Sequence, residues 1–296
     1  MTDPQPHPRP QHYAEPDVLT ADELQAIEEK FDPALRFRTW LRPVAILCGA
    51  VLFLLSCYHY YTAGFGIPQA TVHRGVHMAA TVFLVFMSFS AFGRHEPDRG
   101  PLAILGIPAI DWAMGIAGAV ASLYVPWIYD QLAFRVGNPS QTDVIMGTIL
   151  IVVLLEAVRR SMGWPLPVIA ILFMAYAYFG QSMPGILVHP GASWANIVNH
   201  LYLTSQGIYG TALGVIATYV FHFVLFGVMA TRIGLGQLFI DVASAAAGRY
   251  AGGPAKVSVL SSALLGSISG SSIANTVTTG ALTIPAMIKV GYQRHF

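Results

Sequence analysis

Charged residues are scarce in this chain. Only 10% of its 296 residues are Asp, Glu, Lys or Arg, whereas a soluble domain carries about 25%. Hydrophobic residues make up 54%, and the mean hydropathy is +0.56. The formal net charge of +1 also lacks the basic surplus that favours nucleic acid. This composition excludes an ordinary soluble domain, and it predicts an all-α polytopic membrane protein in a lipid bilayer with no nucleic-acid partner.

Cysteine is almost absent, and the two cysteines cannot pair with each other. Cys48 and Cys57 lie in one apolar run, where helical rise separates them by about 13 Å. The ten histidines show no ligand spacing with Cys, Asp or Glu. A phosphate-binding loop of the form G-x-x-x-x-G-K-[ST] is also absent. The sequence therefore predicts no cofactor, no ATP chemistry and no catalytic or structural metal.

The N-terminal region lacks the apolar core of a signal peptide. Residues 1–19 are rich in proline and predict a disordered tail. Residues 20–39 begin with a capping box and place Leu24, Ile27 and Phe31 on one helical face. This second pattern predicts an amphipathic helix that lies at the membrane interface.

Long apolar runs, in contrast, are abundant. The segment Ser193–Leu203 is too short and polar to span, so we expect an interfacial helix with Trp194 and Tyr202 at headgroup level. Two of the runs are short and depend on flanking residues for length. We expect about six transmembrane helices, near Pro43–Tyr61, Gly75–Phe92, Ile107–Ile128, Val144–Ala157, Pro165–Gly180 and Tyr209–Ile233.

The distribution of basic residues predicts the orientation. With the N-terminus in the cytoplasm, Arg74 and Arg135 fall outside, which leaves fourteen of the sixteen Lys and Arg residues inside. Such a bias is typical of cytoplasmic loops. The sequence thus predicts a multi-pass protein of the bacterial inner membrane with a cytoplasmic N-terminus.

The segment from Gly252 to Tyr292 is apolar, but it cannot cross a membrane as one straight helix. Pro254 begins a helix, small and hydroxylated residues interrupt the pattern at 266–272, and a second apolar run ends at Pro285. Each half of about 12 residues spans about 18 Å, against a hydrocarbon core of about 30 Å. We therefore expect a re-entrant helical hairpin over residues 252–285, with its tip near mid-membrane.

The expected tip has the chemistry of a sodium site. A helix that ends there leaves carbonyl oxygens unpaired, glycine permits close approach, and hydroxyl and amide groups add neutral oxygen ligands. The alternative is that the hydroxyls only satisfy the backbone of a broken helix. The candidate sodium and substrate residues are Gly266, Ser267, Ser269, Gly270, Ser271, Ser272, Asn275 and Thr279.

Other polar residues within the apolar runs have simpler explanations. Glu156 precedes two arginines at i+3 and i+4, which predicts an ion pair at a helix end. Asp111 lies within about one turn of the surface, so we expect a structural role. His77 and His222 are interpreted as hydrogen-bonded packing residues rather than as a proton relay.

Specific motifs gather around the hairpin. They include Gly252-Gly253-Pro254, Gly266-Ser267-Ile268-Ser269-Gly270-Ser271, Ala274-Asn275, Thr279-Gly280 and Thr283-Ile284-Pro285. With these motifs the chain resembles the membrane subunit of tripartite ATP-independent periplasmic (TRAP) transporters. Most similar are the fused permeases that work with TAXI-type periplasmic binding proteins.

This resemblance implies an elevator-type transporter that imports an organic acid with sodium as the coupling ion. Residues 40–160 would form a scaffold like the small four-helix subunit, and residues 161–206 a connector helix and a periplasmic segment. Residues 207–296 would begin the large subunit and its transport region. The large subunit of this family contains two hairpins, so the resemblance further implies a chain truncated after the first, with the remaining half of that subunit as a partner.

Two other functions fit parts of the pattern. Sodium–dicarboxylate or citrate carriers have similar hairpins, but their Ser-Asn-Thr turn is incomplete here because Ala274 precedes Asn275. An intramembrane serine hydrolase would need a Gly-x-Ser-Gly nucleophile, and Ser267 to Gly270 lacks the leading glycine. We therefore expect a transporter and not an enzyme.

Overall fold

The structure is a computed structural model, and it describes residues 37–91, 97, 100, 102–269 and 272–292. The tail expected over residues 1–19 and most of the helix expected over 20–39 lie outside these residues. The chain divides into a first unit, Asp32–Phe226, and a second unit that contains Gly227–Phe296. The two units are compact bodies, each with its own internal packing.

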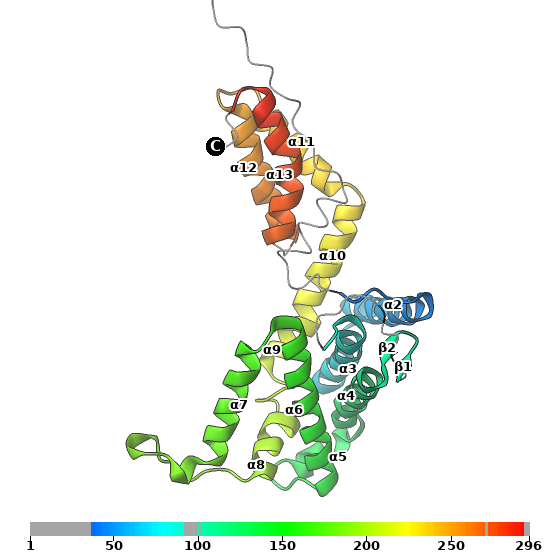
Figure 1. Cartoon of the computed structure of the whole chain (residues 1–296), viewed down its shortest axis with the longest axis vertical. Coiled ribbons are helices and arrows are strands. Elements are labelled where there is room, and N and C mark those ends of the chain that lie inside the picture. The colour runs from blue at the N-terminus through cyan, green and yellow to red at the C-terminus, as the bar shows by residue number, and fades with distance from the viewer. Residues whose placement is uncertain (1–36, 92–96, 98–99, 101, 270–271, 293–296) are drawn as a thin grey trace, which may run out of the picture. The chain divides into compact units, whose positions relative to one another are not determined.

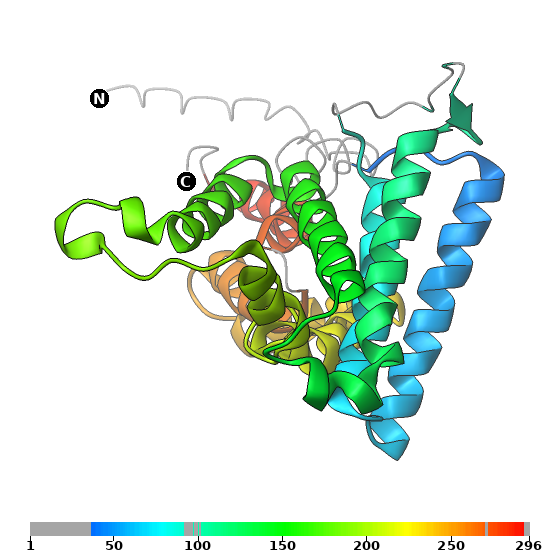
Figure 2. The ribbon, with the colours of Figure 1, turned by 90° about the horizontal axis from the view of Figure 1, so that it is seen from below.

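Long apolar helices form the first unit. In Figure 2, α2, α3 and α4 run side by side, coloured from blue to green. Each begins and ends within six residues of an expected span, because about 20 apolar residues in lipid satisfy their backbone only as a helix. The bounds are α2 (Arg42–Phe65), α3 (Ala70–Ser88), α4 (Ala109–Trp127) and α6 (Gln141–Met162).

A fifth long apolar stretch, Thr211–Ala230, combines α9 (Thr211–Val215), the π-helix η5 (Ile216–Val220) and most of α10 (Phe221–Arg232). In the described part of the chain, these five stretches are long and apolar enough to cross a membrane. The remaining expected span, Pro165–Gly180, is α7 (Pro165–Tyr178), which is apolar but has only 14 residues. The fold is therefore that of an all-α polytopic membrane protein, as the sequence predicts.

Shorter elements connect these helices. A two-residue turn, Leu105-Gly106, has positive φ at both positions and joins β1 to β2, as tight hairpins require. The sequence analysis did not predict these strands. The remaining elements of the first unit are β1 (Ala103–Ile104), β2 (Ile107–Pro108), α5 (Tyr129–Arg135), η2 (Gly180–Ser182), η3 (Gly185–Leu187), α8 (Trp194–Val198) and η4 (Asn199–Leu203).

A buried carboxylate holds the beginning of α6. Ser140 and Asp143 form a reciprocal capping box, and Tyr124 and Arg135 both donate to Asp143 Oδ1, at 2.7 and 2.9 Å. The hydrogen bond to Asp143 raises the pKa of Arg135 above its ordinary value. Three donors, from Tyr124, Arg135 and the Ser140 backbone, thus compensate the burial of a charge that is fully removed from solvent.

The opposite end of α6 carries a network of ion pairs. Glu156 accepts from Arg159 and Arg160 at 2.7 Å, which confirms the predicted helix-end pair. Arg160 also reaches Asp111 Oδ1 at 2.7 Å, while Arg38 reaches Oδ2 of the same carboxylate at 2.7 Å. Asp111 is 1% exposed and joins three segments of the chain. The observed contacts agree with the structural role expected for it.

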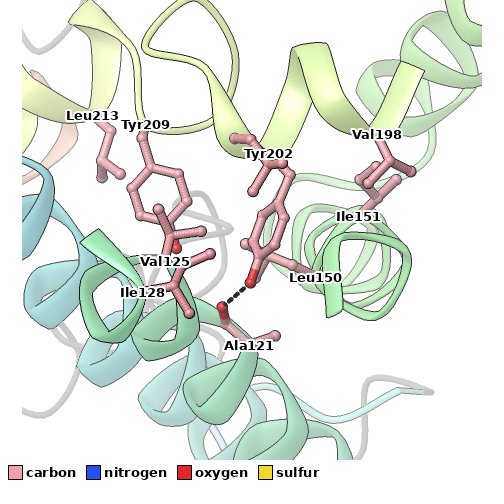
Figure 3. Close-up of a cluster of buried hydrophobic side chains, with 10 residues drawn as sticks. Ala121, Val125, Ile128, Leu150, Ile151, Val198, Tyr202, Tyr209 and Leu213 are labelled. Atoms are coloured by element: carbon pink, nitrogen blue, oxygen red, sulfur yellow. Dashed lines mark hydrogen bonds between the residues drawn. The ribbon is translucent and has the colours of Figure 1, made fainter. Parts of the chain in front are cut away.

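Two tyrosines form the centre of the aromatic core in Figure 3. The Tyr202 hydroxyl donates to the Ala121 carbonyl at 2.6 Å, and the Tyr209 hydroxyl donates to the Ser122 carbonyl at 2.7 Å. Burial raises the pKa of both phenols above the ordinary value. Tyr202 has no exposed surface, so its ring packs inside the protein, and its depth at the headgroup level stays a prediction.

Glycine on α6 explains why Tyr202 is buried. A Cβ at Gly147 would lie 2.8 Å from the Tyr202 ring, closer than real contacts allow. The ring therefore packs directly against the α6 backbone. Trp194 remains 36% exposed and donates to Thr148 on the same helix at 2.9 Å.

The second unit contains α11 (Leu235–Ala247), α12 (Gly253–Ser269) and α13 (Ser272–Lys289). Ala243 and Ala247 on α11 pack against Val257 on α12, which forms a small buried cluster. Small side chains at two of these three positions let the helices approach closely. Figure 1 shows α12 and α13, in orange and red, side by side.

Candidate functional site

The helical hairpin expected at residues 252–285 is present as α12 and α13, but its break is narrower than predicted. The sequence analysis placed the break at 266–272 and the end of the second half at Pro285. Instead, α12 continues through Gly266 to Ser269, and α13 continues past Pro285 to Lys289. The helices have 17 and 18 residues, or about 26 Å each. The depth of the hairpin in the membrane stays a prediction.

Hydroxyl groups account for part of this difference. The Ser267 hydroxyl donates to the Leu264 carbonyl of its own helix at 2.6 Å. Bonds of this kind satisfy the side chain without opening the helix. A glycine within a helix costs only about 1 kcal/mol, and proline bends a helix without necessarily ending it. The serine- and glycine-rich stretch therefore remains helical up to the residues next to 270–271.

Asn275 makes the central polar contact of the hairpin. Its Nδ2 donates to both the backbone carbonyl and the hydroxyl of Ser262, each at 3.1 Å. A Cβ at Gly266 would lie 3.1 Å from the same Nδ2. The absence of a side chain at Gly266 thus lets the amide lie close to the α12 backbone.

The other end of this amide has no partner among the described residues. Asn275 Oδ1 is buried and makes no hydrogen bond to them. The two contacts with Ser262 are to oxygen atoms, so they fix the amide with its nitrogen toward Ser262. A buried acceptor without a donor is costly, and an absent ion is one of the standard reasons for it. Asn275 Oδ1 is therefore the best-defined candidate oxygen ligand for a cation in the described hairpin.

A row of hydroxyl contacts continues along α13 from this amide. Thr279 donates to the Asn275 carbonyl at 2.6 Å, and Thr283 donates to the Thr279 carbonyl at 2.7 Å. The Thr283 hydroxyl also lies 3.2 Å from the Ser258 hydroxyl on α12. Thr279 and Thr283 are each 4% exposed, so these contacts lie between packed helices and not on the surface.

The structure brings some of the predicted site residues together and leaves others apart or undescribed. Asn275, Gly266 and Thr279 come together, whereas the Ser267 hydroxyl is used by its own helix. The backbones of Ser269 and Ser272 end α12 and begin α13, but their side chains lie outside the described atoms. Gly270 and Ser271 lie outside the described residues. Whether these serines bind sodium stays a prediction.

Sequence reasoning missed Ser262, Ser258 and Thr283. Ser258 and Thr283, which meet across the hairpin, each lie twelve residues from the break at 270–271, whereas Ser262 lies eight residues before it and Asn275 four residues after it. Antiparallel helices that meet at a known break bring positions at equal distance from it together. A search for polar residues at equal distance from the break would have found the pair of Ser258 and Thr283, but not the pair of Ser262 and Asn275.

The family described as the tripartite ATP-independent periplasmic transporter, DctM component, matches residues 149–296, which is half of the chain. This protein belongs to the DctM family. The match includes α7, the whole segment that follows it and the complete described hairpin. DctM membership assigns the chain to a transporter component, which separates it from the serine hydrolase alternative.

Two curated relatives carry the same family name. The C4-dicarboxylate TRAP transporter large permease protein DctM of Rhodobacter capsulatus is 35% identical over 74 residues, which are 25% of this chain and 17% of the relative. The protein of the same name from Pseudomonas aeruginosa is 36% identical over 74 residues, with the same coverage. The chain thus covers 17% of the length of these relatives. No solved structure matches the chain.

Proposed function

We propose that this protein is the membrane component of a sodium-coupled transporter that imports an organic acid from a periplasmic binding protein. Membership in the DctM family supports this function, and so does the series of apolar helices that makes the chain a multi-pass membrane protein. Two relatives are named for C4-dicarboxylates, so these acids are the first substrates to test. The binding protein would be of the TAXI type, and the membrane would be the bacterial inner membrane.

One observation carries the sodium part of this proposal. Asn275 Oδ1 is a buried oxygen without a donor, held in place because its amide nitrogen bonds Ser262. Secondary transporters bind sodium with oxygens at interrupted helices. In the proposed mechanism, Asn275 supplies one ligand, and hydroxyls or carbonyls near the break at residues 270–271 supply others.

In the proposed mechanism, the two compact units have different roles. The helices of residues 40–160 would act as a scaffold, and α12 and α13 would belong to the part that moves with the substrate. Inside α12 and α13, buried hydroxyls at Thr279 and Thr283 bond neighbouring carbonyls or hydroxyls. These bonds keep the two hydroxyls paired while the hairpin moves as a rigid body.

A sodium-binding measurement tests the site. The chain is purified in lipid nanodiscs, and binding of radioactive sodium is measured against a potassium background. Asn275→Leu should weaken sodium binding at least tenfold, equivalent to about 1.4 kcal/mol. Ser262→Ala is the matched control, because it removes one partner of Nδ2 but keeps Oδ1 and the Ser262 carbonyl. Equal affinity in wild type and Asn275→Leu would contradict the proposed ligand.

An uptake measurement tests the function itself. Proteoliposomes that contain the protein together with the remaining half of the large subunit receive a substrate-loaded TAXI-type binding protein and an inward sodium gradient. We expect uptake of a labelled dicarboxylate that requires both the gradient and the binding protein. Uptake that proceeds equally with free substrate, or without sodium, would contradict the proposed coupling.

A further inference from the structure

The loop between α7 and α8 exposes an apolar surface. It consists of residues 180–191 and contains η2 and η3; we call it the apolar loop. At its tip, the side chain of Ile186 is 100% exposed, and those of Leu187 and Val188 are more than half exposed. Figures 1 and 2 both show the segment after α7 extending away from the other helices. Single exposed apolar side chains are ordinary, but a contiguous group of them marks an interaction surface.

The sequence around the apolar loop has no charged residue. No Asp, Glu, Lys or Arg lies between Arg160 and Arg232, an interval that contains α7, the apolar loop and the apolar stretch Thr211–Ala230. The turn between α5 and α6 is different, because it has the ion pair of Arg135 with Asp143. Loops that face water are rich in such residues. The composition of the apolar loop therefore matches lipid better than water.

The length of α7 determines the depth of the apolar loop. α7 has 14 residues, which is about 21 Å, whereas the hydrocarbon core is about 30 Å thick. The next turn, η2 (Gly180–Ser182), adds about 6 Å at about 2 Å per residue. Trp164 precedes α7 and is of the type that marks a membrane surface. Measured from that surface, the chain is still at the edge of the hydrocarbon core where the apolar loop begins.

α7 itself faces lipid over most of its surface. Within this helix, which is described in full, only Pro167 is buried. Leu172 and Phe173 are 62% and 70% exposed. A helix that is apolar on every side and also exposed is stable in lipid and not in water. The apolar loop therefore continues a surface that already contacts acyl chains.

The backbone of the apolar loop is paired within the protein. A loop at the edge of the hydrocarbon core has little water near it, so its polar groups need internal partners. The His189 N–H donates to the Gly180 carbonyl at 3.1 Å, and the Ala192 N–H donates to the Ala177 carbonyl at 2.8 Å. These two bonds join the beginning of the loop to its end. Bonds between residues three apart form η2 and η3 inside it.

Side chains reinforce this closed shape. His189 Nε2 lies 3.0 Å from the Tyr176 carbonyl, and its Nδ1 accepts from the Gly191 N–H at 3.1 Å. The Tyr176 hydroxyl donates to the Leu187 carbonyl at 3.0 Å. A Cβ at Gly180 would overlap the His189 ring, so glycine is required for this packing. The apolar tip is thus part of a preformed projection.

We propose that the apolar loop is a membrane anchor whose partner is the lipid bilayer. The loop lies in the interface between headgroups and acyl chains, and the side chains of Ile186, Leu187 and Val188 enter the acyl chains. In the predicted orientation this is the outer leaflet. Lipid is the partner, rather than a soluble protein, because the loop has no charge and begins below the membrane surface. The anchor fixes the end of α7, which is shorter than the membrane is thick.

Spin-label EPR in nanodiscs measures the depth of the tip. Cys48 and Cys57 are replaced by alanine, and a nitroxide is attached at Ile186→Cys. Its collision rates are measured with oxygen, which concentrates among acyl chains, and with a nickel chelate, which stays in water. We expect the oxygen-to-nickel ratio at Ile186→Cys to exceed that at Asn138→Cys about threefold or more. It should be close to the ratio at Phe173→Cys.

The two reference positions represent water and lipid. Asn138 is exposed in the turn between α5 and α6, and Phe173 is exposed on α7. Ile186 is fully exposed, so a cysteine there removes no packing within the described chain. An oxygen-to-nickel ratio at Ile186→Cys equal to that at Asn138→Cys would place the tip in water and overturn the proposal. Low collision rates with both reagents would mean that protein covers the tip, and would overturn it as well.

A charge at the tip provides a second measurement. Val188→Asp, added to Ile186→Cys, should lower the oxygen-to-nickel ratio at the label by about half or more, because a carboxylate is disfavoured among acyl chains. Val188→Leu is the matched control and should leave the ratio unchanged. Val188 is 55% exposed, so both substitutions change a side chain on the surface of the loop. If the two variants give the same ratio, apolar contact with lipid does not hold the tip, and the proposal is wrong.

Discussion

Asn275 and Ser262 are joined across the hairpin by two hydrogen bonds of 3.1 Å, both donated by the same amide nitrogen. This relationship fixes the direction of the amide without using its oxygen. Gly266, one helical turn after Ser262, provides the space in which the amide lies. The buried oxygen is therefore held in place by the fold itself.

Gly266→Ala separates site geometry from stability. The new Cβ would lie 3.1 Å from Asn275 Nδ2, so the amide must move by a few tenths of an ångström. We expect sodium affinity to fall about threefold or more, although alanine stabilises a helix by up to about 1 kcal/mol relative to glycine. Sodium binding and thermal unfolding are measured on the same nanodisc sample.

Gly280→Ala is the matched control for this change. It also replaces a glycine inside a helix of the hairpin, but its Cβ would meet only the end of the Ile284 side chain, at 3.3 Å. That side chain can rotate away, so sodium affinity should stay near the wild-type value. Equal sodium affinity in Gly266→Ala and Gly280→Ala would show that the amide position is not important.

The sequence predicted the helices better than the contacts between them. Apolar runs of about 20 residues determine where spans form, and the pairing of Glu156 with two arginines follows from helical spacing. The contact between Ser258 and Thr283, each twelve residues from the break, needed only the position of the break. These features depend on the spacing of residues along the chain, which can be read directly from the sequence.

Other features depend on helices that are distant in sequence. Tyr202 is buried because Gly147 on α6 leaves room for its ring. The sequence around either residue does not show that the two are in contact. His73 and His77 lie on one face of α3 by spacing alone, but His59 and His222 join them only through packing. The exact end of α12 depends on hydroxyl bonds such as that of Ser267, which composition does not reveal.

Asp111→Asn should strongly destabilise the first unit. Arg38 and Arg160 each bond one oxygen of this carboxylate, and all three side chains are at most 3% exposed. Removing the charge leaves the buried Arg38 without its counter-ion and Arg160 with Glu156 alone, at a cost of about 3–5 kcal/mol. The loss should appear as a lower unfolding temperature in detergent.

Glu156→Gln is the comparison for this prediction. Glu156 bonds two arginines as well, but its side chain is 23% exposed, and so water can replace part of the lost interaction. We expect a cost of about 1 kcal/mol. If Asp111→Asn were no more harmful than Glu156→Gln, burial would not determine the strength of this network.

Cysteine labelling tests the proposed orientation of the membrane spans. The fourteen basic residues assigned to the inside predict that Asn138 and Ser182 face the periplasm, while Met162, beside Arg159 and Arg160, faces the cytoplasm. All three positions are exposed, so a cysteine at each can react. Cys48 and Cys57 are free cysteines and are first replaced by alanine.

The labelling is carried out in intact cells with a thiol reagent that does not cross membranes. Asn138→Cys and Ser182→Cys should react before lysis, whereas Met162→Cys should react only after the membrane is opened. The two periplasmic positions lie on opposite sides of α6 and α7 in sequence, and two crossings would return the chain to the same face. Because α7 has only 14 residues, its crossing is the step that this experiment tests most directly. Labelling of Asn138→Cys but not Ser182→Cys would mean that α7 does not cross, and the orientation of every following helix would then reverse.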